Sequence, residues 1–422
     1  MSSVSKPRVR QNRHKQGLNQ TLEKISADFR ENKKSSKNNQ VKNQIIEYFI
    51  VNGNATNADL AKEFNLSVPT IVKIINEMCD EGFVIEYGKL ETEEGRHPNL
   101  YGLNPESGYF IGVDINATCV HIGLMNFRGD LIDLLTDNSY KHENTPAALE
   151  QLCSIISNYT DKLSVPKEKI FDINVNISGR VNPDTGYSYS VFNFSEAPLA
   201  DFLSHRLGFK VTIENDTRAM TYGEYLKGCA HGEKNVLYIN VSWGLALGMI
   251  IDGNLYTGKS GYAGEFGHNF FVNNEIICHC GKKGCLETEV SGLAFVRIVK
   301  ERVSNGESSN IQQDDKGNFS MEALIEATCN DDTLCIEVVE SMGRKLGQSI
   351  AGLINIFNPE LVVIGGALSV TGDYLMHAIK SSVLKYSLNL MNRDTKLVLS
   401  KLKDRAGVIG ACLIARKRIL EL

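Results

Sequence analysis

Apolar residues recur at helical spacing in the first patterned stretch of the chain. In VKNQIIEYFIVNG they lie three or four positions apart, which predicts a helix over residues 41–52 that ends at Gly53. A second helix is predicted over NADLAKEF, with Thr56 or Asn57 as its N-cap, and a third begins after a cap at Ser67. The stretch FVIEYGKLETEEGRHPNLYGLN then predicts two strands around a polar turn.

The outer face of the third helix is polar, whereas its inner face carries isoleucine and methionine. Short and polar side chains on an exposed helix suit base edges and phosphates in a major groove. Two helices, a capped helix and a β-hairpin over residues 39–104 therefore predict a winged helix-turn-helix. For any one helix pair, the alternative is a generic helical bundle. The residues predicted to contact DNA are Ser67, Thr70, Lys73, Asn76 and Arg96.

From Tyr109 onward, β-rich segments alternate with helical ones. YFIGVDINATCVHIGLMNFRGDLI predicts two strands joined at INAT, and VLYINVSWGLALGMIIDGNLY repeats this layout. Gly123 corresponds to Gly248 and Gly129 to Gly253, at offsets of 125 and 124 residues. A unit that occurs twice, with helices between its strands, predicts two α/β lobes that face each other across a cleft.

Charge is distributed unevenly along the 422 residues, a length that suggests two or three domains. Residues 1–38 carry ten basic and three acidic side chains, a net charge of +7, and the remainder therefore carries −12 of the total of −5. A basic arm indicates an anionic partner, although a solvated tail is the alternative. The sequence has neither a membrane-length apolar run nor an apolar signal core, so we expect a cytoplasmic protein that binds no membrane.

Three of the ten cysteines are clustered. Cys278, Cys280 and Cys285 lie within eight positions, and His268 precedes the first by ten residues. Three sulfurs and one imidazole are the donor set of a tetrahedral structural zinc site. The alternative, buried or disulfide-bonded cysteine, is disfavoured by the tight spacing and by the missing secretory signal. A zinc hydrolase is also disfavoured, because four protein ligands close the coordination shell.

The motif GEFGH followed by CHCGKKGCLE resembles the signature of the ROK family, which contains repressors and sugar kinases, and the resemblance extends over nearly the whole chain. It implies that the metal loop is structural and forms one wall of a sugar pocket. The metal ligands so implied are His268, Cys278, Cys280 and Cys285, with zinc as a structural ion. The sugar contacts so implied are Asn193, Asn215, Asp216, Glu265, His268 and Glu287. The GRHP turn resembles the wing of the family's repressors, and the sugar kinases lack this head.

The expected fold class is α/β: an N-terminal winged helix-turn-helix followed by a duplicated, actin-like (ribonuclease-H-like) two-lobed domain. The basic arm covers residues 1–38, the DNA-binding head 39–104 and the sugar-binding domain 105–422. Lobe 1 is expected over about 105–220 together with the C-terminal helix, and lobe 2 over about 221–405. The C-terminal stretch GVIGACLIARKRILEL is predicted to be an amphipathic helix that packs on lobe 1.

Both phosphate-binding turns depart from the pattern of the family's kinases, which use glycine-rich turns. The first turn reads DINAT, with Asn116 and Ala117 where the kinases carry glycine. The second reads SWGLALG, with Trp243 at the position of the phosphate-binding threonine and Leu247 in place of another glycine. Because backbone amides reach a polyphosphate only where the chain lacks side-chain bulk, we expect ATP binding to be lost and the sugar pocket retained.

These features predict a sugar-responsive transcriptional regulator, and the family resemblance makes it a repressor of carbohydrate-utilisation genes. It would bind operator DNA as a homodimer or a dimer of dimers and take a sugar or sugar-phosphate effector in its cleft. Arg218 is a hint that this ligand is anionic. We expect no enzymatic activity. The alternative is an active ATP-dependent ROK sugar kinase with a fused DNA-binding domain, since Asp216 matches the kinases' catalytic general base.

Gly365 and Gly366 in VVIGGALS resemble the family's adenosine-side turn, but we interpret them as packing glycines between a strand and a helix.

Overall fold

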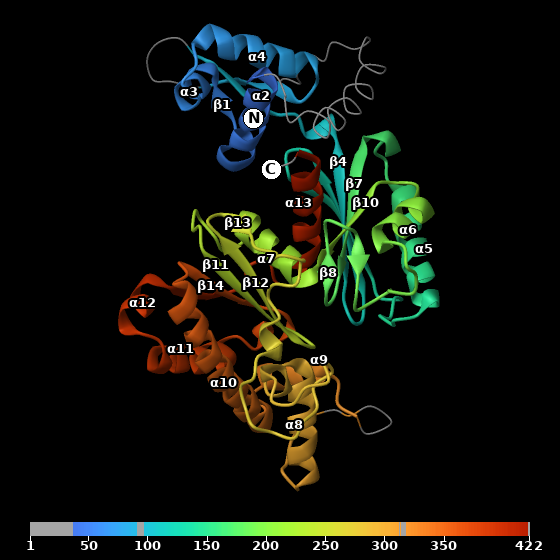
Figure 1. The fold of residues 1–422 in the computed structure, drawn as a ribbon, viewed down its shortest axis with the longest axis vertical. Helices are drawn as coiled ribbons and strands as arrows, with labels where there is room; N and C mark the ends of the chain where they lie inside the picture. The colour runs from blue at the N-terminus through green and yellow to red at the C-terminus, as the bar shows by residue number, and fades with distance from the viewer. Residues whose placement is uncertain (1–36, 91–96, 312, 314–317, 421–422) are drawn as a thin grey trace, which may run out of the picture.

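The computed structural model describes residues 37–90, 97–311, 313 and 318–420. Most of the basic arm and the wing residue Arg96 therefore lie outside the described residues. The described chain forms a head, a first lobe and a second lobe, arranged along the long axis of the molecule (Figure 1). Within the described part, no helix combines the length and the apolar character needed to cross a membrane.

The head is a winged helix-turn-helix, as predicted. Its elements are α2 (Lys37–Asn52), β1 (Ala55–Thr56), α3 (Asn57–Glu63), α4 (Val68–Asp80), β2 (Val84–Lys89) and β3 (Asn99–Leu103). Thr56 caps α3 in a reciprocal box with Asp59, and the Ser67 hydroxyl caps α4 by accepting from the Thr70 amide at 3.3 Å. Strand β1, which the hydrophobic pattern did not predict, pairs with β3 and completes a three-stranded sheet.

Lobe 1 is built on a five-stranded sheet with the order β10-β7-β4-β5-β6. Its strands are β4 (Tyr109–Ile115), β5 (Val120–Asn126), β6 (Leu131–Asp137), β7 (Ile170–Ile177) and β10 (Val211–Asn215). The short strands β8 (Val181–Asn182) and β9 (Tyr187–Ser188) form a separate hairpin. Helices α5 (Pro146–Lys162) and α6 (Leu199–Leu207) cover one face of the sheet, and α13 (Ala406–Leu420) covers the other (Figure 1).

Lobe 2 repeats the sheet of lobe 1, with the order β13-β12-β11-β14-β15. Its strands are β11 (Val236–Val241), β12 (Leu245–Ile251), β13 (Asn254–Leu255), β14 (Leu361–Gly365) and β15 (Lys396–Leu399). Its helices are α8 (Gly292–Ser304), α9 (Met321–Cys329), α10 (Thr333–Phe357), α11 (Asp373–Tyr386) and α12 (Asn389–Asp394).

The duplication predicted from the glycines is confirmed strand by strand. In both sheets the first three strands of the lobe are antiparallel to one another, and two parallel strands follow on the other side of the first. Gly123 lies in β5 and Gly248 in its counterpart β12, while Gly129 and Gly253 occupy the following turns with φ of 99° and 79°. Positive φ at these turns favours glycine, which explains why the repeat shows itself in glycine spacing.

The C-terminal helix was predicted to be amphipathic, and this prediction is wrong. Every residue from 406 to 416 is buried, so these residues have no exposed polar face. Helix α13 lies between the sheet of lobe 1 and α7 (Asp216–Lys227), which joins the lobes. The contact is very close, since a Cβ on Gly410 would lie 1.8 Å from the Ala219 carbonyl oxygen. Helix α7 also runs without a break through residue 220, where the two lobes were expected to divide.

The head and lobe 1 share one hydrophobic core. The Phe83 ring of the head lies 5.7 Å from the Phe127 ring of lobe 1, and Phe127 stacks at 6.3 Å on Phe110 of β4. Ala415 and Leu420 of α13 are buried in the same cluster. Since these side chains are almost fully buried, the head is packed on lobe 1 as one body rather than tethered by a loose linker.

Candidate functional site

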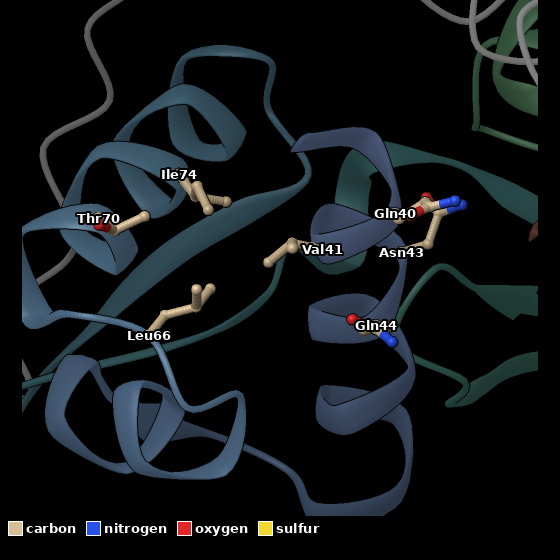
Figure 2. Close-up of a pocket in the computed structure, with 7 residues that line it drawn as sticks. All are labelled: Gln40, Val41, Asn43, Gln44, Leu66, Thr70 and Ile74. Atoms are coloured by element: carbon tan, nitrogen blue, oxygen red, sulfur yellow. The ribbon is translucent and has the colours of Figure 1, made fainter. Parts of the chain in front are cut away.

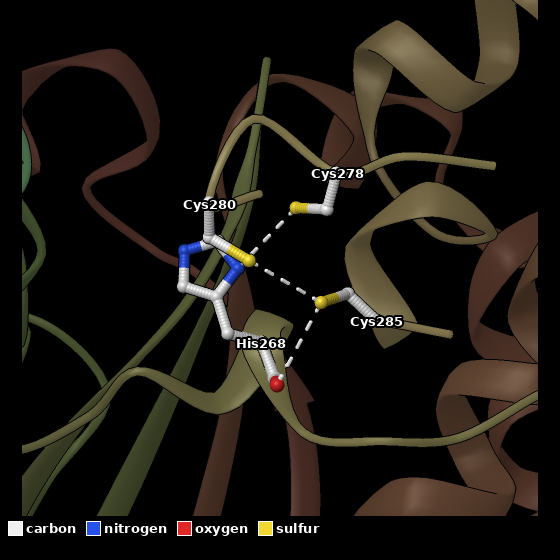
Figure 3. A group of neighbouring side chains, drawn as sticks. All are labelled: His268, Cys278, Cys280 and Cys285. Atoms are coloured by element: carbon white, nitrogen blue, oxygen red, sulfur yellow. Dashed lines mark hydrogen bonds between the residues drawn. The ribbon is translucent and has the colours of Figure 1, made fainter. Parts of the chain in front are cut away.

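The predicted metal ligands converge at one point in lobe 2 (Figure 3). One ligand atom each from His268, Cys278, Cys280 and Cys285 lies within 4.8 Å of the others. The His268 Nδ1 to Cys278 Sγ distance is 3.5 Å, and the Cys280 and Cys285 sulfurs are 3.6 Å apart. A tetrahedral ion with metal–sulfur bonds of about 2.3 Å places its sulfurs roughly 3.8 Å apart, so the four residues fit a metal ion.

Short turns of the loop bring the thiols together. The Cys278 amide donates to the Lys282 carbonyl at 2.8 Å, and the Gly281 amide donates to the Cys278 carbonyl at 2.8 Å. Gly281 has φ of 84°, a conformation that favours glycine. Burial raises the pKa of the Cys278 thiol to about 12, so a metal that binds the thiolate must displace a firmly held proton.

Three predicted sugar contacts surround the metal cluster. The Nδ1 atom of His268 faces the thiols, while its Nε2 atom lies 3.6 Å from a carboxylate oxygen of Glu265. Glu287 is buried, and its Oε2 atom accepts a hydrogen bond from the Leu245 amide at 3.0 Å. The two nitrogens of His268 therefore face different groups, and this holds the ring in one orientation.

His279 is a member of this group that sequence reasoning missed. Its Nδ1 atom lies 3.0 Å from Glu287 Oε1, and its ring meets that of His268 edge to face with 5.0 Å between centroids. His268, His279 and Glu287 also form a second set of three potential metal-binding groups. Its position between Cys278 and Cys280 in the sequence could have indicated that His279 lies at this site.

Asn215 and Asp216 form the lobe 1 part of the candidate site, at the end of β10 and the start of α7. Asn215 caps the helix, because its Oδ1 atom accepts from the Arg218 amide at 3.0 Å. The N-cap of α7 is therefore Asn215 rather than Asp216. The Oδ2 atom of Asp216 accepts from the Ser178 hydroxyl at 2.7 Å, and burial raises the pKa of the Asp216 carboxyl above its ordinary value.

Arg218 does not offer its charge to a ligand, contrary to the hint taken from its position. It is buried, and its Nε atom donates to Glu214 Oε1 at 2.7 Å. One Nη atom donates to the Gly261 carbonyl at 2.6 Å and the other to the Val181 carbonyl at 3.2 Å. Arg218 therefore ties the loop of lobe 2 at Gly261 to β8 of lobe 1.

The predicted sugar contact Asn193 comes from another segment of lobe 1. It is exposed in the segment between β9 and α6. The adjacent Phe192 is buried with φ of 57°, and its amide donates to the Asn144 side chain at 2.8 Å. Within the described part of the chain, no hydrogen bond joins Asn193 to Asn215 or Asp216.

Protein groups pack closely around the start of the first degenerate phosphate turn. Asp114 at its start is fully buried, and its Oδ1 atom accepts from the Asn176 side-chain amide at 2.7 Å. A Cβ on Gly407 of α13 would lie 2.3 Å from the same carboxyl group. Burial raises the pKa of Asp114 to about 6, and the group points into the protein rather than towards solvent.

In the second turn, backbone donors are used within the protein. The Ser242 amide donates to the Gly244 carbonyl at 3.0 Å, and the Leu245 amide donates to Glu287 Oε2 at 3.0 Å. Trp243 is half-buried against the core of lobe 2.

The glycines of VVIGG are close-packed, as predicted. A Cβ on Gly365 would lie 2.0 Å from the Tyr238 hydroxyl, and a Cβ on Gly366 would lie 2.4 Å from the Asn240 side-chain oxygen.

The predicted DNA-reading side chains of α4 are exposed. Thr70, Lys73 and Asn76 face solvent, and Ser67 is exposed with its hydroxyl 2.7 Å from that of Thr70. Lys42 pairs with Glu77 at 3.2 Å and with Glu81 at 2.7 Å, so its single positive charge partly offsets the two negative charges beside this face.

A groove of about 660 Å³ separates α2 from α4 and the turn before it (Figure 2). Its lining residues are Gln40, Val41, Asn43, Gln44, Leu66, Thr70 and Ile74. Since Thr70 lines it, this groove adjoins the DNA-reading face of the head and lies outside the two lobes.

Residues 110–418 match the ROK family, and residues 39–85 match the winged helix-turn-helix DNA-binding family. The first match covers most of the chain, so this protein belongs to the ROK family. More particularly, it is a ROK protein with an N-terminal DNA-binding head.

Known relatives include both regulators and kinases. The chain is 28% identical to the xylose repressor of Caldicellulosiruptor bescii, over 87% of this chain and 92% of that protein. It is 29% identical to the glucokinase of Halalkalibacterium halodurans, over 74% of this chain and 96% of that protein. A solved ROK family transcriptional regulator, a homologue of the E. coli MLC protein, superposes with a TM-score of 0.75 at 26% identity, over 90% of this chain and 95% of that one.

Proposed function

We propose that this protein is a sugar-responsive transcriptional repressor that binds operator DNA through its head and a sugar or sugar phosphate in the cleft of its ROK domain. One observation carries the proposal: the head, with its exposed DNA-reading face, shares a hydrophobic core with lobe 1. Lobe 1 also contains Asn215 and Asp216. The relative named a xylose repressor supports the combination of a head with a ROK domain, because its match covers 87% of this chain.

Sugar would be held by groups from both lobes. Asn215, Asp216 and Asn193 would contact hydroxyls from lobe 1, and Glu265, His268 and Glu287 from lobe 2. The carboxylates accept hydrogen bonds from hydroxyl groups, and the Nε2 atom of His268 is available on the side away from the thiols.

A structural zinc ion would be bound by His268, Cys278, Cys280 and Cys285. When bound, zinc would cross-link the loop. It would have a structural role, because four protein ligands leave no open position for water. The loop residues then hold His268 and Glu287 in place for the sugar. The spacing of the four ligand atoms supports this assignment.

The signal would travel by a change in the angle between the lobes. Helix α7 joins them, and its crossing with α13 is too close to slide freely. Since the head is packed on lobe 1 and on the end of α13, a rotation of lobe 1 carries the head with it. In a homodimer or a dimer of dimers, that rotation changes the spacing of two heads on a palindromic operator. Sugar has this effect only if it binds the two arrangements with different affinity.

A second candidate is an active sugar kinase with a fused DNA-binding domain. One observation favours it: Asp216 keeps a raised pKa and a hydroxyl partner in Ser178, as a general base could. Against it, the Leu245 and Ala367 amides of the second lobe already have protein acceptors, and Trp243 adds bulk at the turn.

The proposal is tested by selecting an operator from random duplex DNA with the purified protein and then titrating a sugar panel against that complex. Release of DNA by one sugar, without consumption of ATP, is the expected result. Formation of ADP together with a sugar phosphate would favour the kinase.

A further inference from the structure

Three tyrosines gather at the junction of the two lobes, and neither the metal site nor the sugar contacts account for them. Tyr187 and Tyr189 belong to lobe 1, and Tyr262 belongs to the loop of lobe 2 that precedes Glu265. The Tyr187 and Tyr189 rings are 6.1 Å apart and inclined by 28°, whereas Tyr262 stands at 89° to Tyr189 with 5.6 Å between centroids. Two nearly parallel rings and one perpendicular ring form an aromatic corner.

The corner is exposed, although its members are large. Tyr189 is 45% exposed and Tyr262 is 39% exposed. Single exposed aromatic residues are ordinary, whereas contiguous exposed apolar patches often mark interaction or ligand-binding surfaces. The corner is also held in place, since the Tyr187 hydroxyl donates to the Glu196 carbonyl at 3.0 Å and the Tyr189 amide donates to the Arg180 carbonyl at 2.9 Å.

The corner is continuous with the candidate sugar groups on both sides. On the lobe 1 side, Arg180 follows Gly179, whose carbonyl accepts from the Asn215 side chain at 3.0 Å. On the lobe 2 side, Tyr262 follows Gly261, whose carbonyl accepts from Arg218 at 2.6 Å. Tyr262 is therefore one residue from a group that contacts Arg218, and Tyr189 is hydrogen-bonded to Arg180, which follows the Gly179 that contacts Asn215.

Tyrosine rings suit a carbohydrate ring in particular. A pyranose presents a face of C–H groups with partial positive charge, and an aromatic ring has a negative face. The Arg180 guanidinium is exposed beside the corner, with its Nε atom 3.4 Å from the Ser190 hydroxyl, and it adds hydrogen-bond donors that a sugar hydroxyl can accept. An apolar protein segment would leave the Arg180 donors without acceptors.

We propose that the aromatic corner of Tyr187, Tyr189 and Tyr262 is a second carbohydrate subsite, so that the effector is a disaccharide or longer glycoside rather than a single sugar. One unit is held by the candidate sugar contacts beside the metal loop, and the next unit packs on Tyr189 and Tyr262. This inference rests on the proposed sugar-binding function and extends it to the class of ligand.

Calorimetric titration with matched pairs of probes tests the proposal: xylose and xylobiose, glucose and cellobiose, glucose and maltose, and N-acetylglucosamine and its β-1,4 disaccharide. For at least one pair, the disaccharide should bind about three- to tenfold more tightly than the monosaccharide, the gain typical of one or two aromatic contacts. Tyr189→Ala and Tyr262→Ala should remove this gain and leave monosaccharide affinity unchanged.

Tyr386→Ala is the matched control, because Tyr386 is also 45% exposed but lies at the end of α11. It should bind all probes as the unaltered protein does. Disaccharides that bind no better than their monosaccharides in every pair, or a gain that survives both corner variants, would overturn the second subsite while the proposed function stands. If no sugar of either size binds, both the sugar-sensing function and the subsite are wrong.

Discussion

Replacing Gly410 by alanine tests the close crossing of α13 and α7, on which communication between the lobes depends. The added methyl group would lie 1.8 Å from the Ala219 carbonyl oxygen and 2.4 Å from its carbon. An ordinary contact is about 3.5 Å, so the helices must separate by roughly 1.7 Å. Forcing a methylene-sized group into a packed core costs up to about 3 kcal/mol, and alanine in a helix returns about 1 kcal/mol. The expected net loss of stability is about 2 kcal/mol.

Gly352→Ala is the matched control for that variant. Gly352 also lies inside a helix, α10, but a Cβ there meets no atom within 4 Å. Only the gain in helix propensity remains, so this variant should be stabilised by about 1 kcal/mol. Scanning calorimetry of both variants should therefore show shifts of opposite sign in the unfolding temperature. A Gly410→Ala protein as stable as the unaltered one would refute the tight crossing.

Three further predictions concern the metal loop, the second phosphate turn and a buried carboxyl group. The unaltered protein should contain one zinc ion per chain by atomic absorption, and Cys285→Ser should lower this content and weaken sugar binding at least tenfold, since the ligand set then loses a sulfur. Fluorescence of Trp243, the only tryptophan, should not change on addition of ATP and magnesium but should change on addition of a bound sugar; a saturable response to ATP would contradict the loss of nucleotide binding. Burial raises the pKa of Asp172 to about 6, so the folded state holds this proton more tightly than the unfolded chain and stability falls as pH rises from about 4 to 6. Over the full pKa shift this changes the free energy of unfolding by about 3 kcal/mol. Asp172→Asn should flatten the dependence of that free energy on pH, as measured by urea titrations at several pH values.

Local patterns predicted most of the fold. The helices of the head follow from apolar spacing, and the caps at Thr56 and Ser67 follow from residues that accept a hydrogen bond from the first turn. The duplicated sheets follow from glycines at corresponding positions, one pair in strands and one pair in turns where a positive φ favours glycine. The metal cluster was also predictable, since three of its four ligands lie within eight residues.

Features that depend on distant segments were missed. The burial of residues 406–416 in α13 depends on Ala219 and on the sheet of lobe 1, almost 200 and 300 residues away along the chain, so the periodicity of the helix alone gave the wrong answer. The role of Arg218 depends on the Gly261 carbonyl, which no local pattern connects with it. The contact of Tyr189 with Tyr262 joins two lobes and is visible only once they are placed together.

The central claim, that sugar in the ROK cleft controls the head, is tested most directly by measuring the anisotropy of a labelled operator duplex with and without saturating sugar. Coupling between sites in regulators is typically 1–3 kcal/mol, so we predict that operator affinity falls at least fivefold when the sugar is bound. Operator affinity that stays constant while calorimetry shows the sugar bound would contradict the account.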